Sequence, residues 1–304
     1  MASKLARLRA RLPTYWTYIR ERPTWLVVLL LGRILPVRSV ERKLIGGSIR
    51  AIAMPPTTRL HVSEPDKIIS DLKVDGVSTR FRLAERDVEE IYAFAIATRC
   101  KTRIPPIQSF LPLEFEIANQ ARHHDVLAAY YFSEVERCPV IGALERDPMM
   151  LEVANAFIGG TPYHIRTRLW WSFPGKRICD EDLHATAQDR YHFDLNGFRT
   201  LKFFYYVTDV DQNTGPHTFI AGSHVHRKAR HQYTFMVGHD EEDLRKIYPN
   251  QHFRTVTGPA GTGFAEDPFI FHAGRVCRDK ARLLLEIEYG PRPASPSYRY
   301  GELG

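Results

Sequence analysis

The sequence predicts a mainly β protein with a double-stranded β-helix core, a cupin-like jelly roll, against which a helical N-terminal half packs. The chain has 304 residues, 44% apolar and 25% charged, an ordinary composition for a globular protein. Its first half carries apolar residues at helical spacing, and its second half consists of short β-branched and aromatic runs between Pro and Gly. Short strands separated by turn residues are typical of a jelly roll of two sheets.

The helical expectation covers residues 51–160. Apolar residues recur at helical spacing over residues 84–98. Asp147 followed by a proline is typical of a helix start, because the carboxylate caps free backbone N–H groups and proline fits the first turn. Gly159 suits a helix end. A helix is therefore predicted over residues 149–158.

The strand expectation covers residues 161–304, which together with the helical part form one domain over residues 51–304. The runs in this region are short, apolar and bounded by turn residues, as expected for strands of two packed sheets. The predicted strands are residues 163–173, 200–207, 217–220, 264–271 and 283–289.

The net charge of +7 is concentrated at the N-terminus. Residues 1–50 hold eleven Lys or Arg and two acids, a local net charge of +9, so the remaining residues are slightly acidic. A protein that binds nucleic acid would spread basic residues over a folded face. A nucleic-acid partner is therefore not expected, and residues 1–50 are described as a basic, partly apolar arm.

The arm contains an apolar run over residues 25–31, followed by Arg33 and Pro36. This run is too short to span a bilayer, which needs about 20 residues, and it lacks the cleavage pattern of a signal peptide. Two interpretations stay open: peripheral contact of residues 1–36 with an anionic membrane surface, or a helix packed on the body.

The cysteines form no paired or metal-binding spacing, which favours a reducing compartment over a disulfide framework. We therefore expect a cytoplasmic protein, with peripheral membrane association as the open alternative. The four cysteines are Cys100, Cys138, Cys179 and Cys277.

His192 and Asp194 are two residues apart, so on an extended segment both side chains leave the same face and can bind one ion. Alone, this spacing is more often a surface turn than a metal site. A longer ordered set follows it. Residues 213–224 read Asn-Thr-Gly-Pro-His-Thr-Phe-Ile-Ala-Gly-Ser-His, residues 258–272 form a glycine-rich turn and a strand ending near His272, and Arg282 begins an apolar strand.

With this ordered set, the chain over roughly residues 145–290 resembles the phytanoyl-CoA dioxygenase-like family of iron(II)- and 2-oxoglutarate-dependent oxygenases. The resemblance implies that His192, Asp194 and His272 bind Fe(II). Two imidazoles and one carboxylate on one face of the ion leave three positions for a bidentate 2-oxo acid and O₂. In such a family, 2-oxoglutarate is converted to succinate and CO₂ while a substrate C–H bond is oxidised.

The resemblance also assigns the far carboxylate of 2-oxoglutarate to Arg282, because a planar guanidinium matches a carboxylate in two parallel hydrogen bonds. Arg275 and Arg278 compete for this role but fall in a loop. Glu286 and Glu288 share the face of Arg282 by alternation, and a bulge or solvent exposure there would weaken its assignment.

Several further side chains have weaker signals. Lys202, on the strand that follows the His-x-Asp segment, is a second predicted contact of the cosubstrate, with a structural role as the alternative. His224 is interpreted as structural. Trp170 and Trp171 either flank the substrate or belong to the core.

The presence of Asp194 favours hydroxylation, or desaturation or ring closure, over halogenation, in which related enzymes lack the carboxylate. The expected substrate is a small molecule, a lipid or a lipid-linked sugar. The rival from another class is a metal- or ligand-binding jelly roll without turnover, because function belongs to the site and not to the fold.

Overall fold

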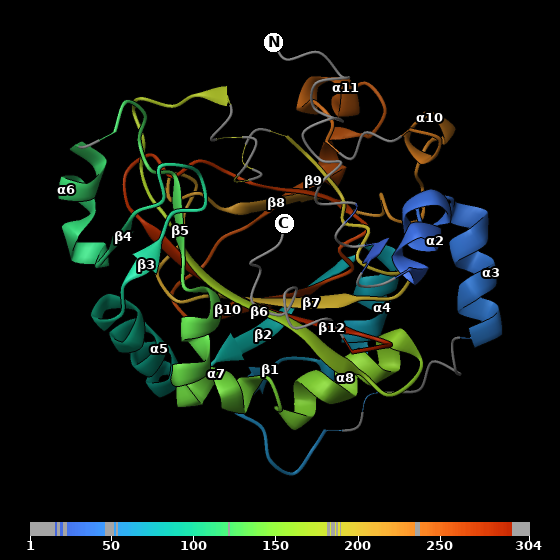
Figure 1. Cartoon of the computed structure of the whole chain (residues 1–304). Helices are drawn as coiled ribbons and strands as arrows, with labels where there is room; N and C mark the ends of the chain where they lie inside the picture. Colours follow the sequence, from blue (N-terminus) through green and yellow to red (C-terminus); the bar gives the residue numbers. More distant parts are fainter. Residues whose placement is uncertain are drawn as a thin grey trace.

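The computed structural model describes residues 23–45, 54–120, 122–180, 190–234 and 238–293 and, outside these ranges, residues 16, 19–20, 52, 183, 186 and 188. Two antiparallel sheets face each other, and helices cover the outer side of the larger sheet (Figure 1). The predicted fold class, a jelly roll with a helical N-terminal part, is confirmed.

The larger sheet has nine strands, and every neighbouring pair in it is antiparallel. From one edge to the other its strands are β1 (Leu60–Val62), β2 (Val77–Leu83), β10 (Thr262–Glu266), β7 (Leu201–Tyr206), β12 (Arg282–Gly290), β6 (Tyr163–Ser172), β5 (Ala128–Tyr130), β3 (Cys100–Lys101) and β4 (Ser109–Phe110). The smaller sheet is formed by β11 (Phe271–Gly274), β8 (His217–Ile220) and β9 (Phe253–Val256).

The helices that cover the larger sheet come mainly from the predicted helical region. They are α4 (Ile68–Val74), α5 (Glu85–Ala97), α6 (Phe115–Gln120), α7 (Pro139–Leu144) and α8 (Pro148–Ile158), with short 3-10 helices at Pro65–Lys67, Pro112–Glu114 and Phe132–Arg137. Beside the smaller sheet lie α10 (Ala229–Gln232), α11 (Glu241–Arg245) and a 3-10 turn at Asn250–His252.

The ends of α8 agree with the prediction. The carboxylate of Asp147 accepts hydrogen bonds from the N–H groups of Met149 and Met150 at 2.9 and 3.3 Å. Gly159 ends the helix with φ +75°, a conformation that glycine adopts without steric cost. The cap also explains why the first turn of this buried helix leaves few free donors.

Two expectations need refinement. Residues 51–160 contribute β1 to β5 as well as helices. The sequence did not predict these strands, because four of them have only two or three residues and show no alternation. The fifth, β2, is stabilised by its pairing with β1 and β10. The predicted strand over 264–271 is two strands, β10 and β11, that belong to different sheets. Asp267-Pro268 separates them, since proline cannot donate a ladder hydrogen bond.

The two faces of the larger sheet have different roles. On the outer face Leu283, Leu285 and Ile287 of β12 pack with the helices in one core cluster. On the inner face Leu284 packs with Phe204 and residues of the smaller sheet in another. Because side chains alternate along a strand, the even-numbered residues of β12 point between the two sheets.

The predicted arm includes α2 (Thr24–Leu31) and α3 (Leu35–Ile45), which pack on the body. Val28 and Leu35 contact the cluster that contains Phe193, Phe269 and Phe271. The packed-helix interpretation therefore holds for these two helices. Among the residues described, no helix has the length and apolar character needed to cross a membrane.

Candidate metal centre

His192 and His272 lie opposite each other because their backbones pair. The N–H of each residue donates to the carbonyl of the other at 2.8 Å, in an isolated antiparallel bridge that extends the smaller sheet beyond β11. Residues paired in this way point their side chains to the same face. The two imidazole rings are accordingly 4.3 Å apart, centroid to centroid.

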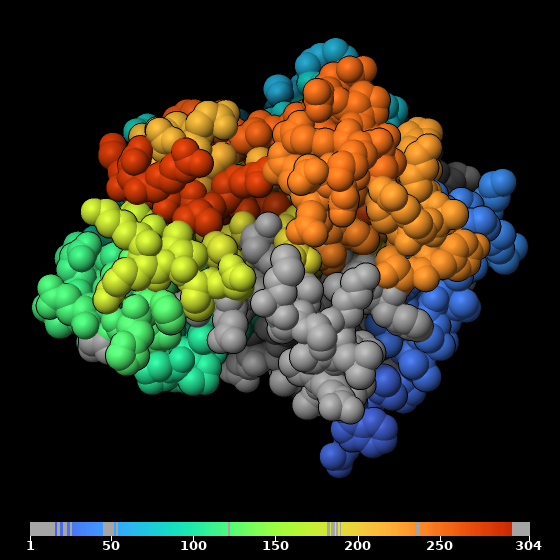
Figure 2. Space-filling model, turned by 90° about the horizontal axis from the view of Figure 1, so that it is seen from above, coloured from blue at the N-terminus to red at the C-terminus, as the bar shows by residue number. Residues whose placement is uncertain are grey.

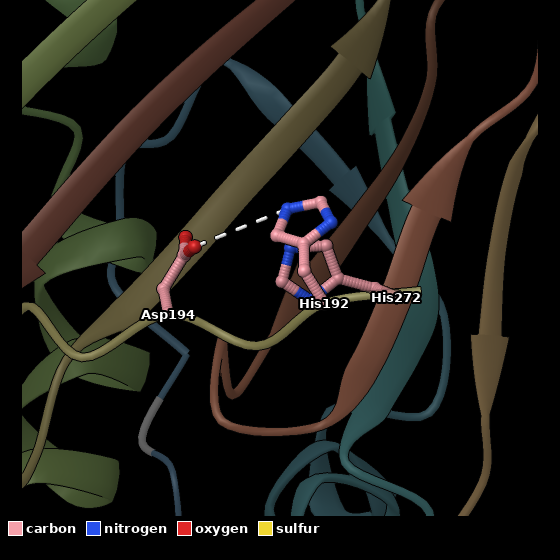
Figure 3. A group of neighbouring side chains, drawn as sticks. All are labelled: His192, Asp194 and His272. Atoms are coloured by element: carbon pink, nitrogen blue, oxygen red, sulfur yellow. Dashed lines mark ion pairs between the residues drawn. The ribbon is translucent and has the colours of Figure 1, made fainter. Parts of the chain in front are cut away.

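Asp194 completes the group, since it follows His192 by two residues on an extended segment. Its N–H donates to the carbonyl of Pro268 at 2.8 Å, which holds the segment against the turn before His272. One ligand atom from each of the three residues lies within 4.8 Å of the others, and the side chains point toward one another (Figure 3). The structure thus brings together the three predicted metal ligands.

The donor set fits Fe(II). His192 Nε2 and Asp194 Oδ1 are 4.0 Å apart, so a small side-chain adjustment would bring both to the roughly 2.1 Å at which such donors bind a divalent ion. Two imidazole nitrogens and one carboxylate oxygen are the ligands of non-haem Fe(II) oxygenases. Ligation by these three residues stays a prediction that the geometry supports.

In both histidines Nε2 is the unprotonated ring nitrogen, with a lone pair that can bind a metal ion. Nδ1 of His192 donates to the carbonyl of Arg190 at 3.4 Å, and Nδ1 of His272 donates to that of Ile270 at 3.1 Å. A hydrogen bond at one ring nitrogen selects the tautomer whose other nitrogen has a free lone pair. Burial lowers the pKa of both imidazoles, to about 4 for His272, so each is neutral at physiological pH.

Lys202 on β7 is an ion-pair partner of Asp194. Its ammonium group bonds Asp194 Oδ2 and lies 3.7 Å from Glu286 Oε2. Burial opposes ionisation of Asp194, but Lys202 and the two histidines outweigh it and hold the pKa of this carboxyl well below its usual range. Lys202 therefore occupies Oδ2 and leaves Oδ1 for an ion, while its predicted contact with 2-oxoglutarate stays untested.

Arg282 is a buried cation on the inner face of β12, with 3% of its surface exposed. It donates from Nη1 to the carbonyl of Gly215 and from Nη2 to Ser172 Oγ at 2.9 Å. Within the described part of the chain, no carboxylate pairs with Arg282 and its Nε has no hydrogen-bond partner. A buried charge without a counter-ion is costly, so this position calls for an anionic ligand.

The acids beside Arg282 on β12 are occupied elsewhere. Glu286 pairs with Arg166 and Arg168, and Glu288 pairs with Arg166 at 2.9 Å. The strand has an irregularity between Glu288 and Tyr289, but both glutamates are fully buried. Solvent exposure therefore does not weaken the Arg282 assignment, and the irregularity lies six residues beyond Arg282, so the assignment stays a prediction.

The two competing arginines are less suited to bind the cosubstrate. Arg275 is partly exposed and pairs with Glu241 at 2.5 Å and with Tyr191 OH at 3.1 Å. Arg278 is exposed. Of the three candidates only Arg282 combines burial with the absence of a described carboxylate partner.

Glu266 and His217 form a buried pair that the sequence analysis did not find. Glu266 Oε2 lies 2.6 Å from His217 Nε2, and Glu266 Oε1 lies 3.5 Å from His272 Nδ1. Burial raises the pKa of Glu266 to about 7 and lowers that of His217 to about 3. His217 is therefore neutral, and Glu266 keeps its proton to a higher pH than an ordinary carboxyl. The ring of His217 stacks on that of His272, with centroids 5.6 Å apart.

The remaining positions named from the sequence are Trp170, Trp171 and His224. Trp171 packs in the helical core, whereas Trp170 is partly exposed on the inner face of β6. His224 Nε2 lies 3.1 Å from the carbonyl of Lys73, which agrees with a structural role.

Arg38 on α3 supports the loop that carries Asp194, a role that no pattern in the sequence indicates. Its guanidinium donates to the carbonyls of Gly197 at 3.3 Å and Phe198 at 2.6 Å, and it lies 3.8 Å from the ring centroid of Phe269. Helix α3 is thus attached through Arg38 to the loop that follows Asp194.

We expect Arg38→Met to weaken divalent metal binding roughly tenfold, because residues that orient metal ligands contribute at this level. Methionine keeps most of the side-chain volume but leaves the carbonyls of Gly197 and Phe198 without their donor, at a cost of about 1–3 kcal/mol each. Isothermal titration with Mn(II) would measure the effect. Lys43→Met, an exposed position of the same helix, is the control and should bind like wild type.

Four buried histidines make the stability of the metal-free protein depend on pH. Burial lowers the pKa of His217 to about 3 and of three others to about 4, from an ordinary 6.5. Below about pH 6.5 the unfolded chain binds protons that the folded chain cannot. The three histidines with a pKa of about 4 are His224, His231 and His272. Glu266 has a raised pKa, so its protonation stabilises the folded chain on acidification and offsets the effect of one histidine.

The free energy of unfolding should therefore fall as the pH is lowered from about 6.5 to about 4, by about 1.4 kcal/mol per pH unit for each histidine not offset by Glu266. Urea denaturation of the metal-free protein across this range would measure it. A free energy of unfolding that stayed constant, or rose, on acidification would contradict the buried, neutral histidines.

Comparison with known proteins agrees with the site. Residues 88–278 match the model of the family described as phytanoyl-CoA dioxygenase (PhyH). AviO1 from Streptomyces viridochromogenes Tue57 has a similar structure, with a TM-score of 0.50 and 14% identity over 75% of this chain and 96% of that one. The non-heme alpha ketoglutarate dependent epimerase SnoN from nogalamycin biosynthesis gives 0.50 and 17% over 73% and 81%. No curated protein matches the sequence.

At these identities the two structures show a shared fold only. The family match extends further, because it covers more than half of the chain and includes His192, Asp194 and His272, although it ends just before Arg282. It confirms the predicted family and its cofactors, Fe(II) with 2-oxoglutarate and O₂ as cosubstrates. The chain belongs to the phytanoyl-CoA dioxygenase (PhyH) family and is an enzyme of the iron- and 2-oxoglutarate-dependent oxygenase superfamily.

Proposed function

We propose that this enzyme hydroxylates a small molecule, a lipid or a lipid-linked sugar, with release of succinate and CO₂. The observation that carries the proposal is the arrangement between the two sheets. His192, Asp194 and His272 converge at one place, and Arg282, which pairs with no carboxylate among the described residues, lies on the inner face of the same jelly roll. A dicarboxylate chelated to a metal by one end needs such a cation for its other end.

Each residue has a defined part in this proposal. Bound Fe(II) supplies the oxidative chemistry, with 2-oxoglutarate as the reductant and O₂ as the oxidant. The two histidines and Asp194 hold the ion on one face and leave the other face open. Lys202 fixes the Asp194 carboxylate, and Arg282 fixes the orientation of 2-oxoglutarate through its far carboxylate. Ser172 and the Gly215 carbonyl hold the guanidinium in place.

Hydroxylation is preferred to halogenation because Asp194 is present and ion-paired, so no ligand position is vacated for a halide. Desaturation, ring closure and epimerisation need the same metal group, and one structure of the same fold is named an epimerase. These reactions differ in their products. A hydroxylated product gains one oxygen atom, a desaturated or cyclised product loses two hydrogen atoms, and an epimer keeps its mass.

The test is to incubate the purified enzyme with Fe(II), 2-oxoglutarate and isotopically labelled O₂ in the presence of fractionated metabolite and lipid extracts. Succinate release that rises with one fraction, together with a product that contains one labelled oxygen atom, would support hydroxylation. A product of unchanged mass, or one lacking two hydrogens, would replace it by epimerisation or desaturation. Absence of succinate with every fraction would favour the non-catalytic jelly roll.

A further inference from the structure

Helix α2 exposes an apolar side to solvent. Leu26, Val27, Leu30 and Leu31 are exposed by 39, 49, 47 and 41%. These positions lie on one side of the helix, because residues four apart are neighbours on its surface. The opposite side packs on the body through Val28. We call these four exposed residues, together with Tyr233, the α2 surface.

Tyr233 adjoins α2 through contacts of its chain neighbours. Gln232 accepts a hydrogen bond from the N–H of Leu35 at 2.8 Å, and the carbonyl of Thr234 accepts one from Arg33. Both figures show the segment that contains α10 beside α2 (Figures 1 and 2). Tyr233 is 72% exposed, and the contacts of its chain neighbours place it beside the residues that follow α2.

Exposed basic side chains occur in the segment next to α2. Lys228 lies just before α10 and Arg230 lies in it, and this helix contacts the start of α3 through Gln232. In the sequence, residues 1–22, which precede α2, carry six Lys or Arg and one acid, Glu21. The surface therefore combines apolar side chains, one exposed tyrosine and an excess of positive charge.

We propose that the α2 surface docks on an anionic lipid membrane. In an anionic bilayer, leucine and valine side chains can insert into the acyl-chain region, tyrosine can lie at the headgroup layer, and the negatively charged headgroups attract basic residues. With eight residues α2 cannot span the hydrocarbon core, which leaves a position parallel to the surface. None of the metal-site residues lies in this surface, so the proposal does not depend on the reaction.

Co-sedimentation tests the proposal with vesicles of phosphatidylcholine alone and of phosphatidylcholine with phosphatidylserine, at low and high salt. Wild type should pellet with the phosphatidylserine vesicles, and less so at high salt, because screening shortens the reach of the basic residues. The double variant Val27→Asp, Leu30→Asp should bind at least tenfold more weakly, equivalent to about 1.4 kcal/mol. Lys228→Ala with Arg230→Ala should weaken binding roughly tenfold on phosphatidylserine vesicles only.

The matched control is Leu113→Asp with Ile117→Asp, two exposed apolar positions on and before α6, 84% and 72% exposed, on the side of the molecule away from α2 (Figure 1). This variant should bind vesicles like wild type. Circular dichroism and Mn(II) titration establish that each variant is folded, independently of vesicle binding. The proposal is supported if the Val27→Asp, Leu30→Asp variant binds Mn(II) normally but no longer pellets with phosphatidylserine vesicles.

Equal pelleting of wild type and the Val27→Asp, Leu30→Asp variant would overturn the proposal. So would pelleting that is independent of phosphatidylserine. A wild type that stays unbound but forms concentration-dependent oligomers, which this variant abolishes, would also overturn it and make the α2 surface an interface between proteins. Failure of succinate release with intact vesicle binding would refute the hydroxylase and leave the docking surface standing.

Discussion

Replacing His192, Asp194 or His272 singly by alanine should remove most Fe(II) binding and all turnover. Each variant leaves two protein ligands for an ion that must keep three positions open for 2-oxoglutarate and O₂, and two ligands rarely suffice. Anaerobic Fe(II) titration measures the binding, and succinate release measures the turnover. One variant with near wild-type activity would show that its residue is not a ligand.

Two comparisons separate loss of a ligand from loss of the fold. Asp194→Asn keeps the shape of the side chain but removes the charge that Lys202 and the ion share, so it should fold and fail to turn over. Asp194→Gly opens a position that a halide could occupy, and hydroxylation should still be lost. His226→Ala, at an exposed histidine outside the predicted ligand set, should behave like wild type.

Arg282→Ala should raise the KM for 2-oxoglutarate about a hundredfold and change the KM for the substrate much less. Truncating one partner of a buried charge pair costs on the order of 3 kcal/mol, and about 1.4 kcal/mol corresponds to a factor of ten. The guanidinium is buried, and its anionic partner is absent from the described chain, so the bound cosubstrate would supply that partner. Steady-state kinetics with 2-oxoglutarate varied would measure the shift.

Arg282→Lys tests whether geometry or charge matters. Lysine keeps the charge but not the planar fork, so an intermediate rise in KM is expected. Arg275→Ala is the control for a nearby loop arginine that already pairs with Glu241, and it should change this KM less than threefold. A large effect of Arg275→Ala with a small effect of Arg282→Ala would transfer the role to Arg275.

The sequence predicted those parts of the site that lie in one short segment or in a fixed order. His192 and Asp194 are two residues apart, which places them on one face without further information. His272 was assigned only through the family resemblance that the ordered set of turns and strands carries. The backbone pairing of His192 with His272, which aligns the rings, joins residues far apart in sequence and could not be read from either segment.

The supporting groups could not be predicted, because each depends on a contact between distant elements. Glu266 meets His217 across the two sheets, and its carboxyl looks in the sequence like any other acid at a strand end. Arg38 lies in the arm that was described only as basic and partly apolar, yet its guanidinium is buried against the loop after Asp194. Local patterns give no sign of such burial, since long charged side chains are mostly exposed.

The fold shows the same limit. Long strands such as β6 and β12 and the capped helix α8 were predictable from their own composition. The short strands β3, β4 and β5 form only as additions to the edge at β6, so their signal lies in the partner and not in their own residues.

The central claim is that one site holds Fe(II) through His192, Asp194 and His272 and 2-oxoglutarate through Arg282. Anaerobic absorption spectroscopy tests it without knowledge of the substrate, because Fe(II) chelated by a 2-oxo acid has a visible charge-transfer band. The band should appear with wild type only when both Fe(II) and 2-oxoglutarate are present. It should be absent in the three ligand variants, and in Arg282→Ala it should need roughly a hundredfold more 2-oxoglutarate. A band of normal strength in Asp194→Ala or His272→Ala, or no band in folded wild type, would contradict the claim.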